Sequence, residues 1–153
     1  MHMKTAIAVL GCFVLANSQN MGVLKKSSEN TFVAMPGLPS CSTAAVQSGD
    51  PSKGPSVLLA KAAAGCLIPW HWHTPTEHVM VVSGNAKLEM KEGGRSAVLG
   101  PGGYTMLPSK HVHQFSCSSA CSFFVYSDGI FDLHYVDANG QEIPPDKALV
   151  KKK

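Results

Sequence analysis

Histidines crowd into one short part of the chain, and their spacing is typical of a metal site. Five of them lie between positions 71 and 113, namely His71, His73, His78, His111 and His113. Successive side chains of a strand point to opposite faces, so His71 and His73 point to the same side and can both turn a ring nitrogen toward one ion. Glu77 has the same parity, and Pro75 predicts a bend that brings its carboxylate back toward the pair. We therefore expect three ligands for a divalent ion within the seven residues 71–77.

The elements that must position these side chains are short strands. From residue 56 onward, apolar runs alternate with Gly, Pro and Ser, and none is long enough for a typical helix. The expected strands are 57–63, 67–72, 77–82, 86–91, 96–99, 104–107, 114–117, 122–126 and 131–136. Strands of this length at intervals of roughly 8–12 residues predict an all-β domain, either an antiparallel barrel or a sandwich.

Four regions are expected along the chain: a signal peptide (1–18), an irregular N-terminal arm (19–54), a barrel (55–137) and a polar tail (138–153). The first region has a short basic start and an apolar run followed by small residues; the alternatives are a buried first element of the domain or a lipoprotein leader ending at Cys12. Dense Ser, Asn, Pro and Gly predict loops in the arm, with one short strand at 30–34. The tail is expected to hold at most a short helix near 145–150.

Length and composition describe one globular domain. The chain has 153 residues, 44% hydrophobic and 15% charged, which excludes a disordered chain or a coiled coil. The net charge of +3 reflects Lys4 and the terminal run 151–153, because the rest of the chain has nine basic residues against ten acidic ones. No nucleic-acid partner is expected from this balance, and no apolar stretch is long enough to span a membrane.

Four cysteines remain once the leader is removed: Cys41, Cys66, Cys117 and Cys121. An even number in an exported chain predicts one or two disulfides. A three-residue hairpin loop would bring Cys117 and Cys121 within bridging distance, which leaves Cys41 to pair with Cys66 or to stay free. The sequence does not choose among the three connectivities, and a zinc site of four thiolates is disfavoured because two close cysteine pairs are missing.

The spacing of the histidines, Glu77 and the flanking glycines resembles the motifs of the cupin superfamily. The first cupin motif is a Gly, five residues, His-x-His, three or four residues, Glu, six residues and a Gly. The chain has Gly65, His71, His73, Glu77 and Gly84 at those intervals. Five specified positions at fixed spacing make this motif a strong signal.

The second cupin motif is matched only in part. It consists of a Gly, five residues, Pro-x-Gly, two residues, His, three residues and an Asn, and the corresponding residues are Gly102, Pro108, Lys110, His113 and Cys117. Lys110 replaces a glycine, which puts the tight turn before the next strand in doubt, and Cys117 replaces the asparagine. His113 fills the position that binds metal in the family.

The resemblance implies a double-stranded β-helix, or jelly-roll barrel, with a metal ion in its mouth held by His71, His73, Glu77 and His113. Three imidazoles and one carboxylate suit one divalent transition metal, with copper, iron or manganese favoured and zinc or nickel as alternatives, and they argue against calcium and magnesium. The alternative is a metal-free barrel whose histidines form hydrogen bonds in the core.

Three further side chains are candidates for catalysis. His111 shares the parity of His113 and could act as an acid, a base or a replacement ligand. Tyr104 and His134 could donate protons at the mouth of the barrel, or could be ordinary barrel residues. His78 has the wrong parity for the metal and is expected at the surface or behind the ligands.

Trp70 and Trp72 have the opposite parity to the ligands and are expected to point away from the metal. Paired aromatic side chains of this kind pack under a neighbouring sheet or in a dimer interface, and less often they bind a sugar or an aromatic ligand. We expect a homodimer.

These observations predict a secreted or periplasmic metal-dependent oxidoreductase that uses O2 or peroxide and acts on a small organic molecule, with sugars and phenolics as candidate substrates. A redox-neutral isomerase or lyase with a Lewis-acid metal is one alternative. A cupin that binds a metal or small molecule without turnover is the other.

Overall fold

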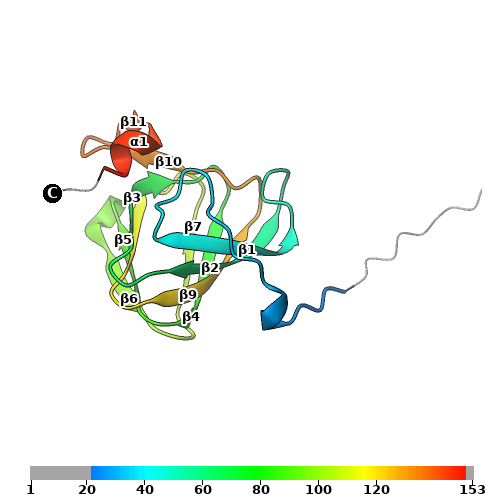
Figure 1. Ribbon diagram of the computed structural model, residues 1–153. Coiled ribbons are helices and arrows are strands. Elements are labelled where there is room, and N and C mark those ends of the chain that lie inside the picture. Colours follow the sequence, from blue (N-terminus) through cyan, green and yellow to red (C-terminus); the bar gives the residue numbers. More distant parts are fainter. Residues whose placement is uncertain (1–21, 151–153) are drawn as a thin grey trace, which may run out of the picture.

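The computed structural model describes residues 22–150, and two antiparallel sheets make up nearly all of its regular structure (Figure 1). The five-stranded sheet has the order β1-β2-β9-β4-β7, formed by β1 (Ser42–Gly49), β2 (Ser56–Ala62), β9 (Cys121–Ser127), β4 (Glu77–Ser83) and β7 (Tyr104–Leu107). The six-stranded sheet has the order β11-β10-β3-β8-β5-β6, formed by β11 (Glu142–Ile143), β10 (His134–Val136), β3 (Leu67–Trp72), β8 (His113–Cys117), β5 (Ala86–Met90) and β6 (Ser96–Leu99). The predicted all-β jelly-roll fold is confirmed.

Among residues 22–150, helical structure is confined to single turns. They are the 3-10 turns η1 (Ser27–Glu29) and η2 (Glu92–Gly94) and the short helix α1 (Pro145–Ala148). Helix α1 begins with Pro145, whose fixed φ and missing N–H suit the first helical position, and it lies with β10 and β11 at one end of the molecule (Figure 1). Within residues 22–150, no helix is long and apolar enough to cross a membrane. The predicted signal peptide lies outside the described residues.

The core forms between the two sheets because their inward-facing side chains are apolar. Strand β5 shows the pattern directly: Ala86 and Leu88 are buried, whereas Lys87 between them is exposed. Phe115 of β8 and Phe123 of β9 contact each other across the sheets, with ring centroids 4.6 Å apart. Burial of an aromatic side chain of this size contributes roughly 1.5–3 kcal/mol, so this contact helps to hold the two sheets together.

The N-terminal arm is more regular than predicted. Strand β1 pairs with β2 from Ser42 to Gly49, whereas only an isolated bridge from Val33 to Ala44 marks the strand expected at 30–34. The run 42–49 consists of small and polar residues without clear alternation, so its strand character depends on pairing with β2 and not on a local pattern. The last expected strand is shorter than predicted, because β10 begins at His134.

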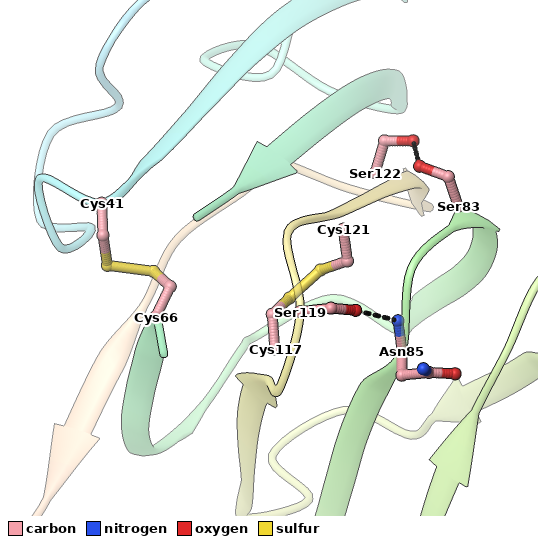
Figure 2. The surroundings of a disulfide bond; sticks show 8 residues. All are labelled: Cys41, Cys66, Ser83, Asn85, Cys117, Ser119, Cys121 and Ser122. Atoms are coloured by element: carbon pink, nitrogen blue, oxygen red, sulfur yellow. Dashed lines mark hydrogen bonds between the residues drawn. A yellow bond between two sulfur atoms is a disulfide. The ribbon is translucent and has the colours of Figure 1, made fainter. Parts of the chain in front are cut away.

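Two disulfides tie the sheets together (Figure 2). The spacing correctly predicted the Cys117–Cys121 bond, but the loop that it bridges is not a hairpin, because β8 and β9 belong to different sheets. Cys41–Cys66 links the residue before β1 to the residue before β3. The Cα–Cα distances are 6.1 and 5.6 Å, respectively, within the range that a disulfide spans. The second bond fixes the end of the N-terminal arm next to the sheet that carries the histidines.

Gly84 lets the chain turn from β4 into β5 against the loop that joins β8 to β9. Its φ is +75°, and a Cβ atom at this position would lie 2.2 Å from the carbonyl oxygen of Ala120. Only glycine fits such an approach without a backbone shift. On either side of it, Ser83 and Ser122 share a hydrogen bond and the Asn85 N–H donates to Ser119 Oγ (Figure 2).

Candidate metal centre

Strand pairing brings the three candidate histidine ligands together. His71 on β3 lies directly opposite His113, the first residue of β8, and His73 follows β3 by one residue. Ring nitrogens of the three side chains lie within 4.8 Å of one another. The cluster therefore depends on the β3–β8 register, which joins residues about forty positions apart in the chain.

Glu77 reaches the same point from the opposite sheet. It is the first residue of β4, so the chain crosses from one sheet to the other between His73 and Glu77, as the bend expected at Pro75 requires. Its Oε2 atom lies 3.5 Å from Nε2 of His73 and 3.5 Å from Nε2 of His113. The structure thus places the Glu77 carboxylate beside two of the three histidines, between the two sheets, whereas the group of atoms within 4.8 Å of one another comprises the histidines alone.

Backbone carbonyls orient each imidazole. The Nδ1 atom of His71 lies 2.6 Å from the Pro69 carbonyl oxygen, and that of His113 lies 2.9 Å from the His111 carbonyl oxygen. Nδ1 of His73 has the Asp132 carbonyl oxygen as its partner. A carbonyl oxygen only accepts hydrogen bonds, so each ring donates from Nδ1, and a neutral ring then keeps the lone pair of Nε2 free, which is the arrangement of metal-binding histidines.

Burial sets the charges of the cluster. His71, His73 and His113 are 2–3% exposed, and Glu77 is 6% exposed. Desolvation lowers the pKa of His71 well below its usual value, helped by the neighbouring imidazoles, and desolvation also lowers the pKa of His73. Burial alone would raise the pKa of Glu77, but positive charge at His73 and at His113 outweighs it, and the pKa is lowered. Burial thus favours neutral rings for His71 and His73, and ionised Glu77 depends on positive charge beside it, which a bound cation would supply.

The residues fit a divalent transition metal. Nε2 of His73 is buried and has no hydrogen-bond partner among the described residues. Its lone pair faces an oxygen of the Glu77 carboxylate, and two acceptors at 3.5 Å do not stabilise each other without a cation or a proton between them. Three nitrogens and one oxygen are suited to Cu, Fe, Mn, Zn or Ni and not to Ca or Mg.

The three predicted catalytic side chains do not line the cavity at this site. Tyr104 is 55% exposed on the outer face of its sheet, where it forms a 2.7 Å hydrogen bond with His78. The His134 ring lies outside the barrel, 2.8 Å from Glu142 and 3.3 Å from Asp132. The prediction that both side chains lie at the mouth of the barrel was wrong. The strand register explains the position of His134, because it pairs with Trp72, whose side chain points outward.

His111 contributes its backbone and not its ring. Its carbonyl oxygen accepts the hydrogen bond from His113, while its side chain lies 4.0 Å from Glu92. Trp72 points away from the ligands, as expected, and stacks on His134 with ring centroids 3.9 Å apart. Its neighbour Trp70 is half-buried.

The two departures from the second cupin motif have structural explanations. Lys110 is the one non-glycine residue with positive φ (60°) among residues 22–150, so the turn keeps the conformation that a glycine would favour. Its N–H donates to the His73 carbonyl oxygen at 2.8 Å, which helps to hold the chain at a candidate ligand. Cys117 forms the disulfide with Cys121.

Sequence reasoning missed the residues that enclose the site. Asp132 supplies the carbonyl for His73, while its side chain accepts a 2.7 Å hydrogen bond from the Thr74 N–H. Met35 and Leu38 of the N-terminal arm line the cavity together with Phe131. No local pattern marked these residues, because the arm and the 128–133 loop acquire their places only through tertiary contacts.

Comparisons with known proteins agree with this architecture. Residues 58–127 match the model of the cupin domain family. An RmlC-like cupin from Ralstonia eutropha JMP134 superposes with a TM-score of 0.66 at 24% identity, covering 84% of this chain and 80% of that one. The polyketide cyclase RemF from Streptomyces resistomycificus has a TM-score of 0.66 at 17% identity, covering 84% and 99% of the two chains.

A third similar structure is the DMSP lyase DddQ from Ruegeria pomeroyi DSS-3, with a TM-score of 0.57 at 19% identity, covering 76% of this chain and 61% of that one. No curated protein matches the sequence significantly. At these identities the structural matches show the fold alone. The family match and the jelly-roll topology agree, and residues 58–127 of this chain form a cupin domain.

Proposed function

We propose that this chain is a mononuclear metal-dependent oxidoreductase that acts on a small organic molecule. One ion of copper, iron or manganese, or alternatively zinc or nickel, would be held by His71, His73, His113 and Glu77. The observation that carries the proposal is the cluster of three buried imidazoles, whose Nδ1 atoms meet backbone carbonyls, with the Glu77 carboxylate 3.5 Å from two of them. When bound, a redox-active ion would supply electron transfer between the substrate and O2 or peroxide.

The lining of the cavity favours redox chemistry over proton transfer. A Lewis-acid isomerase or lyase needs a side chain that moves a proton. Among the described residues that line the cavity, the polar side chains other than the candidate ligands are Ser42 and Thr43. Ser42 Oγ already donates to the Pro39 carbonyl oxygen at 2.9 Å. Neither hydroxyl is an effective base, whereas an oxidation by O2 does not depend on one.

The chain itself contributes orientation, charge and exclusion of water. The carbonyl oxygens of Pro69, His111 and Asp132 keep the three Nε2 atoms aimed at one point. Glu77 supplies one negative charge, so the site with a divalent ion carries a net charge of about +1. The apolar wall excludes bulk water and strengthens the interactions at the site.

Metal analysis combined with O2 uptake tests this proposal. Protein with one equivalent of copper, iron or manganese should consume O2 or peroxide with members of a panel of phenols, sugars and short organic acids, and His113→Ala should not. Stoichiometric zinc without redox turnover across the panel would replace the oxidoreductase with a Lewis-acid enzyme or a binding protein.

We further propose that the protein is secreted or periplasmic. The Cys41–Cys66 and Cys117–Cys121 bonds support this location because disulfides persist in oxidising compartments. Fractionation of cells that express the full-length chain should recover it outside the cytoplasm with no free thiol in the processed form. Recovery in the cytosol with reduced cysteines would contradict this location.

A homodimer is also proposed, through the outer face of the five-stranded sheet. This face exposes the uncharged side chains of Met80, Val82, Tyr104, Met106 and Tyr126. Such a surface can meet its own copy about a two-fold axis without repulsion between like charges. Light scattering should give twice the chain mass, and Met106→Lys should give a monomer; a monomeric mass for the unmodified protein would rule out the dimer.

A further inference from the structure

The cavity beside the candidate ligands is small and mostly apolar. Its volume is about 40 Å3, which is room for only a few water molecules. The walls come from both sheets, with Leu58, Ile68, Phe123 and Val125 among the lining residues. Apart from the histidines and Glu77, the lining residues carry no ionisable side chain.

Residues of the N-terminal arm and of the loop before β10 complete the lining. Met35 and Leu38 come from the arm, and Phe131 and Leu133 come from the loop. Phe131 also packs beside the candidate ligand His73, with ring centroids 4.9 Å apart. We call these four residues the roof, because they belong to neither sheet and close the cavity beside the ligands.

Two connections hold the arm half of the roof in place. The hydroxyl of Tyr135, a residue 1% exposed, donates to the Gly37 carbonyl oxygen at 2.8 Å, between the two roof residues of the arm. The Cys41–Cys66 disulfide follows three residues after Leu38 and fixes the arm to the opposite sheet. The small size of the cavity is therefore built into the fold and does not result from a loose loop.

These features point to the substrate class of the proposed enzyme. We propose that the cavity selects a compact molecule with one anionic head and an otherwise apolar body, such as a short carboxylate or a small phenolate, and rejects sugars. The inference rests on the proposed function, because the positive charge that would meet the anion comes from the divalent ion: with Glu77 the site then carries about +1, and one negative charge balances it.

The body of the ligand must be apolar because the walls offer it almost no hydrogen-bond partners. A sugar would bring several hydroxyl groups out of water against Leu, Ile, Val and Phe side chains. Each buried hydroxyl without a partner opposes binding, so the disadvantage grows with every hydroxyl. Ser42 and Thr43 could satisfy at most a small part of this need. Of the two candidate substrate classes, phenolics avoid this disadvantage and sugars incur it.

Ligand titrations of the Co(II)-loaded protein test the selection, with the visible absorption of cobalt as the signal. Butanoate and 4-hydroxybutanoate differ by one hydroxyl group that lies far from the carboxylate. Butanoate should bind at least about tenfold more tightly, and glucuronate should not bind. Equal affinities for the pair, binding of glucuronate, or no spectral response to any acid would each overturn the proposal.

A substitution in the roof tests whether the N-terminal arm limits the size of the ligand that the cavity accepts. Leu38→Ala enlarges the cavity, so the affinity for cyclohexanecarboxylate relative to butanoate should rise about tenfold. The matched control is Leu24→Ala in the same arm, because Leu24 is 99% exposed and contributes nothing to the cavity. An unchanged ratio in a folded Leu38→Ala protein would remove the arm from the specificity site. The titrations of the unmodified protein decide the substrate class even where this variant does not fold.

Metal content, measured on the same samples, distinguishes failure of the proposed substrate class from failure of the proposed metal-dependent function. Protein that binds one equivalent of Co(II) but does not discriminate between the two acids would refute the substrate class and leave the metal centre standing. Protein that binds no Co(II) would refute the proposed function itself.

Discussion

The molecule places histidines in two contrasting environments. The inner set, His71, His73 and His113, is buried between the sheets, and each Nδ1 atom meets a backbone carbonyl. The outer histidines have side-chain partners: His78 meets Tyr104, and His134 lies between two carboxylates and stacks on Trp72. The residue type is the same in both sets, but the partner atoms differ.

The difference shows how the fold assigns a role to an imidazole. A backbone carbonyl fixes a proton on Nδ1, and for His71 and His73 burial favours the neutral ring, which leaves Nε2 free to bind a cation. Two carboxylates have the opposite effect. Burial alone would lower the pKa of His134, but hydrogen bonds to Glu142 and Asp132 outweigh it and raise the pKa. The surroundings of His134 thus favour its protonated form, whereas those of His71 and His73 favour a neutral ring that can bind a cation.

Removal of one inner histidine should have the largest effect. His113→Ala takes away one of four candidate ligands, and we expect metal affinity to fall by more than about a hundredfold. Competition titration with a metal chelator measures this change. The matched control is His78→Ala on the outer face, which should keep the affinity of the unmodified protein. Stoichiometric metal in His113→Ala would mean that the fourth ligand is assigned wrongly.

Loss of the arm disulfide should weaken the fold without emptying the inner site. The Cys41–Cys66 bond closes a loop with a sequence separation of 25, so replacing both cysteines by serine should lower the free energy of unfolding by about 3 kcal/mol. Metal should remain bound because no cysteine belongs to the inner set. Denaturant unfolding and metal analysis give both readouts. Metal loss after gentle reduction would instead point to a thiolate ligand.

Lys110 connects the two environments, because its N–H donates to the His73 carbonyl while its ammonium group lies 5.8 Å from the centroid of the outer Trp72 ring. Its φ of 60° is unfavourable for a side chain and acceptable for glycine. Lys110→Gly should therefore raise the free energy of unfolding by up to about 1 kcal/mol, measured by urea denaturation. Destabilisation would show that the lysine side chain matters more than its backbone strain.

The smallest effect concerns the outer histidine that carries charge. Because the folded pKa of His134 lies above its unfolded value of about 6.5, the protonated ring stabilises the fold. This contribution is fully present below the unfolded pKa and is lost as the pH rises through the folded pKa. The stability difference between the metal-free parent and His134→Gln should shrink from pH 6 to pH 8. A difference that is constant, or that grows with pH, would contradict the charged cage formed by Asp132 and Glu142.

Much of the fold was predictable because local patterns and tertiary packing agree in it. The strands Leu67–Trp72, Ser96–Leu99 and Tyr104–Leu107 begin and end as their apolar runs indicated. Strand β1 escaped prediction because small polar residues form a strand there only when β2 offers its edge. Parity within one strand correctly placed His71 and His73 on one face.

The register between strands could not be predicted from local sequence patterns, and it determines which side chains meet at the candidate metal site. The pairing of His71 with His113 brings the inner set together, and motif spacing supplied that residue where parity could not. Tyr104 and His134 were placed at the mouth without knowledge of their partners, and pairing puts both outside. The carbonyl oxygens that orient the rings carry no sequence signal, since every residue has one.

The most direct test of the central claim is nitrogen-15 NMR of the histidines during titration of the metal-free protein with Zn(II), a diamagnetic substitute for the native ion. The account predicts saturation at one equivalent, with Nε2 signals of His71, His73 and His113 shifting while their Nδ1 atoms stay protonated and His78 and His134 do not change. Absence of stoichiometric binding, or shifts confined to the outer histidines, would contradict it.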